Sequence, residues 1–326
     1  MPLPQHPSRR PWQRPGRRST RMLAGSLGLL LAAGLAACSS EAMTDQGAGP
    51  SSQAVKSTSS AALASPAVAA DQTFEIDATA GMKYQLPSPT APAGVVAVTL
   101  VNKDPQMPHM AQLFKLHPGV TMKQFRAELL SPGGEGALAP IADPAGGPDG
   151  VGPGHSLTVT LDLAPSSTYA VICSVPGADG TPHYAHGMIT SFTTAANTQQ
   201  GSLPATDQTI TLSDFQFKVA PTLDWSKPVT VVNSGHQPHE VQILGPAQGK
   251  TIADVKAYLM AKPGATPPGP PPYQAYGGVA ATAPGAKQAF TPGLPAGEYL
   301  LVCFVTDPTT HLPHFMMGMM SHVTVP

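Results

Sequence analysis

The sequence predicts an all-β chain of two tandem β-sandwich domains, each with one short helix and a long Pro/Gly-rich loop. The 326 residues leave room for about two domains of roughly 100 to 200 residues each. The 38 Pro and 32 Gly disfavour long helices and suit short strands joined by turns. A pattern of Pro, His, Tyr, Cys, His, Gly and Met occurs twice, offset by 130 or 131 positions, which indicates a duplicated domain.

The first 38 residues read as a targeting segment rather than part of the fold. Six arginines lie between positions 9 and 21, and the apolar run at 23–37 is too short to span a bilayer. The ending Leu-Ala-Ala-Cys at Cys38 resembles a bacterial lipobox, which implies that Cys38 is acylated and becomes the new N-terminus. We therefore expect a lipid-anchored protein on the periplasmic side of a bacterial membrane or at the cell surface.

The composition then divides the rest of the chain. Residues 39–71 are rich in Ser, Ala, Gly and Thr and cannot bury a core, so a disordered tether is expected. The repeat places domain one at residues 72–194 and domain two at residues 205–326, with a polar linker at 195–204.

Each domain shows the same order of elements. β-Branched and apolar runs predict strands, and in domain one these are 94–102, 111–116, 156–163, 168–173 and 188–194. The corresponding runs in domain two are 227–233, 241–246, 288–294, 298–303 and 320–325. The third and fourth runs of each domain are expected to form a closing hairpin. Pro and Gly at 131–154 and 262–278 predict a loop over the surface.

One short helix is expected in each domain, over residues 121–130 and 251–260. Thr121 and Thr251 are N-cap candidates, and Gln124 and Asp254 lie three residues later as capping-box partners. Apolar residues at 122, 125 and 129, and at 252, 255 and 259, give each helix one apolar face.

Charge and cysteine content narrow the functional classes. A net charge of -1 with 11% charged residues provides no basic surface for nucleic acid. Of three cysteines, Cys38 is assigned to the lipid, which leaves Cys173 and Cys303 in separate domains. We do not expect a disulfide between them, and a lone thiol in an oxidising compartment is typically buried or metal-bound.

Four of the repeated residues in each domain, two His, one Cys and one Met, are possible ligands for a soft metal. A thiolate and a thioether favour Cu(I), imidazoles suit Cu(II), and together they are typical of a mononuclear copper site. The candidate ligands are His109, Cys173, His183 and Met188 in domain one, and His239, Cys303, His314 and Met319 in domain two. The sequence thus predicts up to two copper ions per chain.

The strings VVNSGHQPHEV, GEYLLVC and HFMMGM resemble the ligand-bearing segments of plastocyanin-type cupredoxins, and LVNKDPQMPHM, STYAVIC and HYAHGM repeat them. The resemblance implies Greek-key sandwiches, the same eight ligands and electron transfer. The sequence departs from the family in its Cys–His spacing, with nine residues between Cys173 and His183 and ten between Cys303 and His314. Such loops must fold back on themselves. His186 and His311 are alternative ligands.

No constellation of acids, bases or nucleophiles accompanies the ligands, so we do not expect an enzyme. The expected function is single-electron transfer with a redox or copper-handling protein partner. Two alternatives stay open, a metal-free cupredoxin-fold binding or scaffold module and a copper acquisition or delivery protein. The second is suggested by a methionine cluster. Its members are Met107, Met110, Met316, Met317, Met319 and Met320.

Overall fold

Strands dominate the part of the chain that the structure, a computed structural model, describes, which is residues 72–199, 201–261 and 270–326. These residues contain sixteen β-strands, two α-helices and three short 3-10 helices. The all-β prediction with one helix per repeat is therefore confirmed. The predictions of a signal peptide, an acylated Cys38 and a tether lie outside the described residues. Among the described residues, no helix is long and apolar enough to cross a membrane.

The first half of the described chain, residues 72–199, contains eight strands in two four-stranded sheets. The sheet orders are β2-β1-β3-β6 and β5-β4-β7-β8, and the first residues of β3 also pair parallel with β8, which joins the two sheets along one edge. The strands are β1 (Thr73–Thr79), β2 (Lys83–Gln85), β3 (Thr90–Asn102), β4 (Gln112–Leu116), β5 (Ala142–Gly146), β6 (Ser156–Leu163), β7 (Thr168–Ile172) and β8 (Ile189–Gln199). Inward-facing side chains such as Val98 on β3 and Val171 on β7 share one buried core, which makes the half a sandwich.

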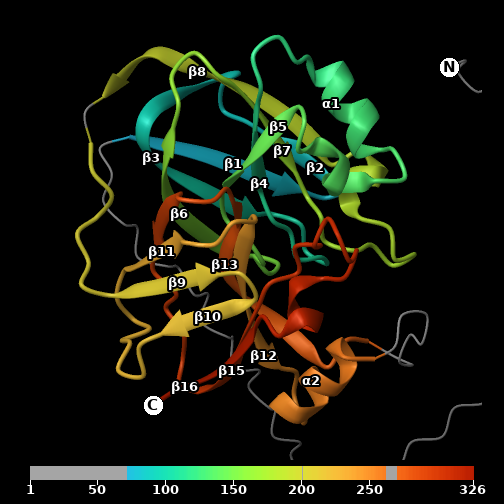
Figure 1. Ribbon diagram of the computed structural model, residues 1–326, viewed down its shortest axis with the longest axis vertical. Helices are drawn as coiled ribbons and strands as arrows, with labels where there is room; N and C mark the ends of the chain where they lie inside the picture. The colour runs from blue at the N-terminus through green and yellow to red at the C-terminus, as the bar shows by residue number, and fades with distance from the viewer. Residues whose placement is uncertain (1–71, 200, 262–269) are drawn as a thin grey trace, which may run out of the picture. The chain divides into compact units, whose positions relative to one another are not determined.

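The second half, residues 201–326, repeats both sheet orders strand for strand. Its sheet orders are β10-β9-β11-β14 and β13-β12-β15-β16, so each strand occupies the position of its counterpart in the first half. The strands are β9 (Thr209–Ser213), β10 (Gln216–Val219), β11 (Val229–Asn233), β12 (His239–Pro246), β13 (Tyr273–Thr282), β14 (Lys287–Phe290), β15 (Gly297–Val302) and β16 (Met320–Val325). Figure 1 labels most of these strands in both halves.

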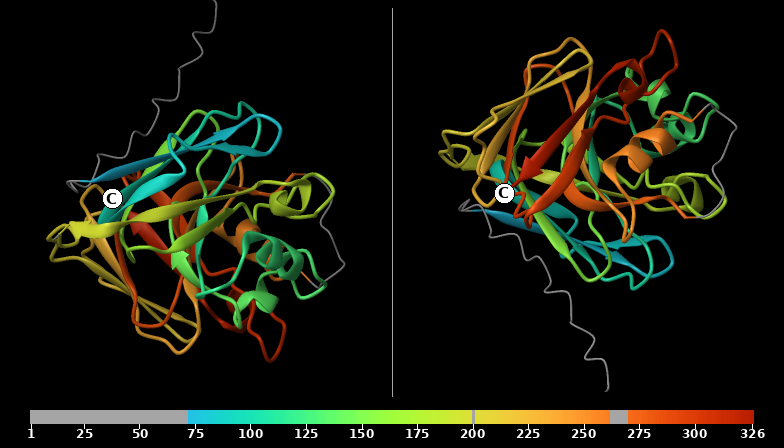
Figure 2. Two further views of the ribbon diagram at one scale, coloured as in Figure 1. Left: turned by 90° about the horizontal axis from the view of Figure 1, so that it is seen from above. Right: turned by 90° about the horizontal axis from the view of Figure 1, so that it is seen from below.

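Each half carries one helix outside its strands, α1 (Met122–Leu129) and α2 (Ile252–Leu259), as both views in Figure 2 show. The predicted capping boxes at Thr121 and Thr251 are present, with each hydroxyl accepting from the backbone N–H three residues later. The predicted apolar faces are buried. Phe125 of α1 packs on β4 and β7, and Val255 of α2 packs on β12 and β15.

The two halves join through equivalent strands. β6 pairs antiparallel with β14, and Val159 lies directly opposite Phe290, its own counterpart 131 positions later. At the second joint, the isolated bridge between Pro148 and Val279 also links residues 131 positions apart. Antiparallel pairing of a segment with its own equivalent is what a two-fold axis produces, so the halves are related by pseudo-two-fold symmetry.

Two details of the sequence-based prediction are wrong. The second Pro/Gly-rich segment, predicted as a surface loop to residue 278, ends within β13, because residues 273–278 pair with β12. The first segment does not lie over the surface either, because β5 pairs with β4 and β13 and residues 146–151 are buried at the joint. Gly147 allows this close packing, since a Cβ there would lie 2.2 Å from the Ala111 carbonyl oxygen.

The expected closing hairpin is also absent from the described strands. β6 pairs with β3 and β14, whereas β7 pairs with β4 and β8, so the two consecutive strands belong to opposite sheets. The same holds for β14 and β15. β8 continues to Gln199, so the beginning of the expected 195–204 linker lies within this strand.

Candidate metal centre

In the first half, three of the four predicted ligands converge on one buried point. The Sγ atom of Cys173 lies 3.4 Å from Nδ1 of His183 and 3.7 Å from Nδ1 of His109. The two Nδ1 atoms are 3.2 Å apart. All three side chains are almost completely buried.

The second half reproduces this triangle. The Sγ atom of Cys303 lies 3.5 Å from Nδ1 of His314 and 4.0 Å from Nδ1 of His239, and the two Nδ1 atoms are 3.0 Å apart. Cys173 and Cys303 are both free thiols, as expected. In the described part of the chain, these two groups are the clusters in which three His or Cys side chains lie close enough together to hold one metal ion.

The separations fit a single ion at the centre of each triangle. Metal–sulfur and metal–imidazole bonds of about 2.3 and 2.0 Å place bound sulfur and nitrogen atoms roughly 3 to 4 Å from one another. The six measured separations, from 3.0 to 4.0 Å, lie in this range. The donor set of one sulfur and two imidazole nitrogens is the set expected for copper.

A defined backbone feature positions each of these candidate ligands. Cys173 follows the last residue of β7 and Cys303 the last residue of β15, so both lie at the ends of central strands. The loops that carry the first histidines are held by asparagine side chains. Asn102 Nδ2 donates to the carbonyls of Met107 and Val151, and Asn233 Nδ2 donates to those of Gln237 and Thr282.

The long Cys–His loops fold back on themselves, as predicted. The His183 N–H donates to the Val175 carbonyl, and the Tyr184 N–H donates to the Cys173 carbonyl. In the second half, the corresponding bonds run from His314 to Val305 and from Phe315 to Cys303. Because these bonds close each loop, its extra length does not displace the second histidine.

Short 3-10 helices follow the loops, at His183–His186 and His314–Met317. Each ends at a glycine in the left-handed region, Gly187 with φ +98° and Gly318 with φ +110°. Such values strain any residue with a Cβ, which explains why a glycine precedes the methionine in both halves.

The glycine turns bring Met188 and Met319 back beside the cysteines. The N–H of Cys173 donates to the Met188 carbonyl and that of Cys303 to the Met319 carbonyl, and both methionines are fully buried in the same core. Coordination by their sulfur atoms stays a prediction. The alternative ligands His186 and His311 are exposed, and His186 Nε2 contacts Thr181 and Asp179 instead of a cysteine.

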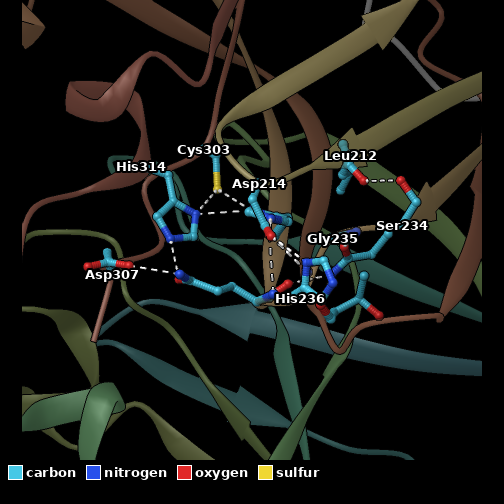
Figure 3. A network of polar contacts seen from close by, with 12 residues as sticks. Leu212, Asp214, Ser234, Gly235, His236, Cys303, Asp307 and His314 are labelled. Atoms are coloured by element: carbon cyan, nitrogen blue, oxygen red, sulfur yellow. Dashed lines mark hydrogen bonds and ion pairs between the residues drawn. The ribbon is translucent and has the colours of Figure 1, made fainter. Parts of the chain in front are cut away.

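Polar residues outside the repeated pattern hold the histidines of the second half. His239 Nε2 donates to Asp214 Oδ1 over 3.0 Å, and His314 Nε2 lies 3.1 Å from Gln237 Oε1. Gln237 in turn donates from Nε2 to Asp307 over 2.8 Å. Figure 3 shows Cys303, His314 and Asp214 around a common point, with Asp307 at the outer end of this chain of contacts. Sequence reasoning missed all three partners.

Burial keeps the ligand groups neutral while no ion is bound. It raises the pKa of the Cys173 thiol to about 12, and burial together with the nearby Glu240 raises the pKa of Cys303. Burial, and then the neighbouring imidazole, lowers the pKa of His183 and of His314 to about 4. Neutral imidazoles are ready to coordinate, whereas each thiol must lose its proton before it becomes a strong ligand.

The comparisons with known proteins give distant structural likenesses. No protein-family model matches the chain, and no curated protein matches it. Among solved structures, the chain is similar to dithionite-reduced auracyanin from Roseiflexus castenholzii, with 25% identity over 39% of this chain and 99% of that one, TM-score 0.27. It is also similar to auracyanin A, a "blue" copper protein from Chloroflexus aurantiacus, with 19% identity over 37% and 97% of the chains, TM-score 0.27.

A multicopper oxidase covers more of the chain, with 15% identity over 78% of this chain and 88% of that one, TM-score 0.19. The all-β, cupredoxin-like sandwich is supported independently by the strand order in each half and by the convergence of His, Cys and His at one end of the central strands.

Proposed function

We propose that the chain binds one copper ion in each half and passes single electrons. The observation that carries this proposal is the convergence of a cysteine sulfur and two histidine Nδ1 atoms within 3.0 to 4.0 Å in both halves. His109, Cys173 and His183 would hold one ion, with Met188 as the fourth ligand. His239, Cys303, His314 and Met319 would hold the other. Bound copper supplies a one-electron couple between Cu(I) and Cu(II).

The surrounding residues favour metal binding over a metal-free role. In the second half, the Nε2 protons of His239 and His314 are committed to Asp214 and Gln237. The Nδ1 lone pairs then face each other at 3.0 Å inside a buried site, which is unfavourable unless a positively charged ion lies between them. This geometry argues against the binding-module alternative.

The same residues would keep the site nearly unchanged when the electron arrives or leaves. Backbone hydrogen bonds fix the cysteine, the second histidine and the methionine to one another, and burial excludes water from the ligands. A site that does not rearrange between two oxidation states favours fast electron transfer. No catalytic acid or base is assigned, and we propose a non-enzymatic role with a protein redox partner.

Metal titration of residues 39–326 tests the proposal. We expect up to two bound copper ions and a thiolate-to-copper absorption band in the oxidised protein. Cys173→Ser and Cys303→Ser should each remove one ion and part of the band, and the double variant should remove both. Ser174→Ala, beside the first cysteine, serves as the control. Protein that remains folded and binds no copper after reconstitution would contradict the proposal.

The second candidate, copper delivery, rests on the methionines next to the second site. Met316 and Met317 lie in the 3-10 helix that begins at His314, and both are partly exposed. Thioethers at such a position suit the hand-over of Cu(I). A copper ion that cycles reversibly and stays bound in the presence of a Cu(I) chelator supports electron transfer. Rapid loss to the chelator supports delivery.

We also propose export and lipid anchoring through Cys38, on the resemblance of residues 35–38 to a lipobox. In a bacterial host, the wild-type chain should incorporate labelled fatty acid and fractionate with membranes. Cys38→Ser should lose both properties, while Cys303→Ser should retain them. A wild-type chain without label would overturn this part of the proposal and leave the copper sites untouched.

A further inference from the structure

The two candidate metal sites differ in how their first histidines are held. Asn102 and Asn233 occupy equivalent positions, and each accepts at Oδ1 from the N–H two residues later, which belongs to Asp104 in the first half and Gly235 in the second. Asp104 therefore corresponds to Gly235. One loop carries a carboxylate at this position, and the other has no side chain there.

Because Gly235 has no side chain, the carboxylate of Asp214 from the turn between β9 and β10 fits beside His239. A Cβ at Gly235 would lie 2.5 Å from Asp214 Oδ1 and 2.8 Å from His239 Nε2. Asp214, in the turn between β9 and β10, fills this space and accepts from His239 Nε2, from His236 and from the Gln237 N–H. Figure 3 shows Asp214 between Gly235 and Cys303.

The second histidine of this site is held by an equally specific chain. Since Gln237 donates to Asp307 from its amide nitrogen, its oxygen faces His314 Nε2 at 3.1 Å. His314 must therefore carry its proton on Nε2, and its Nδ1 presents a lone pair towards Cys303. Asp307 is itself fixed by the N–H groups of Thr309 and Thr310.

The first site holds its two histidines more loosely. Asp104 Oδ2 lies 3.5 Å from His109 Nε2, a longer contact than the 3.0 Å between Asp214 and His239. Among the described residues, Nε2 of His183 is buried and has no hydrogen-bond partner. Neither imidazole of the first site is therefore held with its proton on Nε2 as firmly as those of the second site.

We propose that Asp214 and Gln237 are positioning residues that make the second-half site the tighter copper site, which fills before the first. A hydrogen bond to the distal imidazole nitrogen fixes the tautomer and raises ligand basicity, and loss of such a partner typically costs 10- to 100-fold in metal affinity. This inference rests on the proposed copper sites.

Single-site variants of the full chain test the order of binding. Cys173→Ser leaves the second site and Cys303→Ser leaves the first, and competition with a Cu(I) chelator under anaerobic conditions gives each affinity. We expect the second site to bind at least about 10-fold more tightly. Asp214→Ala and Gln237→Leu should each weaken it by about 10- to 100-fold and leave the first site unchanged, and Asp214→Asn should recover most of the loss.

Asp224→Ala is the matched control, because Asp224 also accepts hydrogen bonds within a turn of the same half but contacts none of the proposed ligands. Equal affinities of the two sites would overturn the proposal. So would an unchanged affinity in folded Asp214→Ala protein.

A metal-free measurement separates this inference from the proposed function. Nitrogen NMR of the histidine side chains should show His239 and His314 protonated on Nε2 in the wild type, and Gln237→Leu should give mixed tautomers at His314 alone. If these tautomers are found but no copper binds, the proposed function fails while the positioning roles stand. If copper binds but His314 is protonated on Nδ1, the positioning role of Gln237 is wrong.

Discussion

Gly278 on β13 lies against the Val241 carbonyl of β12, so close that a Cβ at position 278 would be 1.9 Å from that oxygen. The φ of Gly278 is +152°, which residues with a side chain rarely adopt. The glycine also accepts at its carbonyl from the Asp149 N–H of the first half. One small residue thus closes the β12–β13 pair and contributes to the joint between the halves.

Gly278→Ala should therefore destabilise the metal-free protein by about 3 kcal/mol or more, because the backbone of two strands must separate. Gly285→Ala is the control, since Gly285 also has a positive φ of +81° but nothing within 4 Å of an added Cβ. Strain alone should cost the control about 1 to 2 kcal/mol. Urea unfolding of both variants measures the difference, and equal losses would contradict the role of the close approach.

Asp149 should make stability fall as pH rises. Burial raises the pKa of this carboxyl to about 7 from 3.8, although Gln242 and the Gly150 N–H donate to it. Below about pH 4 the carboxyl is protonated in both states and costs nothing. Between about pH 4 and 7 the unfolded chain releases this proton first, so stability declines, and above pH 7 the loss is complete at up to roughly 4 kcal/mol.

Asp149→Asn cannot ionise and keeps an acceptor oxygen for Gln242. The variant should match the wild type near pH 4 and be more stable at pH 8, as measured by urea unfolding of metal-free protein at both values. Asp162→Asn, an exposed position on β6, should show no such gain. A gain of the same size at pH 4 would exclude ionisation as its cause.

His183, not His186, should determine copper binding in the first half. His183 Nδ1 lies 3.4 Å from Cys173 Sγ, whereas His186 is exposed and contacts Asp179. With the second site removed by Cys303→Ser, His183→Ala should abolish the thiolate-to-copper absorption, and His186→Ala should leave it. Loss of the band in His186→Ala alone would reverse this assignment.

The N-cap of α2 should contribute measurably to stability. Thr251 accepts from the Asp254 N–H, and Asp254 accepts from the Thr251 N–H. Thr251→Ala should cost about 1 kcal/mol in the free energy of unfolding, because one N-terminal donor of the helix loses its partner. Thr222→Ala, in an exposed loop of the same half, is the control in the same thermal unfolding measurement.

The two His-Cys-His triangles could be predicted from the sequence because their residues belong to the repeat. Each His and Cys recurs in register, and a residue that is ordinary alone becomes informative when its neighbours recur with it. Asp214 is not part of the repeated pattern. The aspartate beside the first histidine of the other site, Asp104, comes from a different loop, and Asp214 lies 25 residues before His239. Only the packing of the β9–β10 turn on the loop that carries His239 therefore reveals its role.

The contacts between the halves could not be predicted from the sequence for a similar reason. Pro144 and Gly147 read as loop residues, since Pro and Gly favour turns, yet both lie where one half meets the other. The β6–β7 pairing was wrong because consecutive strands commonly form hairpins, whereas the packing of two sheets sends these two strands to opposite layers. Such choices depend on contacts far apart in the chain.

The alignment of Val159 with Phe290 and of Pro148 with Val279 has a consequence for how the two sites can differ. In a dimer of identical chains, every substitution appears twice, and both sites change together. Here both copies belong to one polypeptide, so a carboxylate such as Asp214 can be gained at one site without its twin. Covalent fusion therefore allows two copies of one sandwich to differ in how firmly their histidines are held.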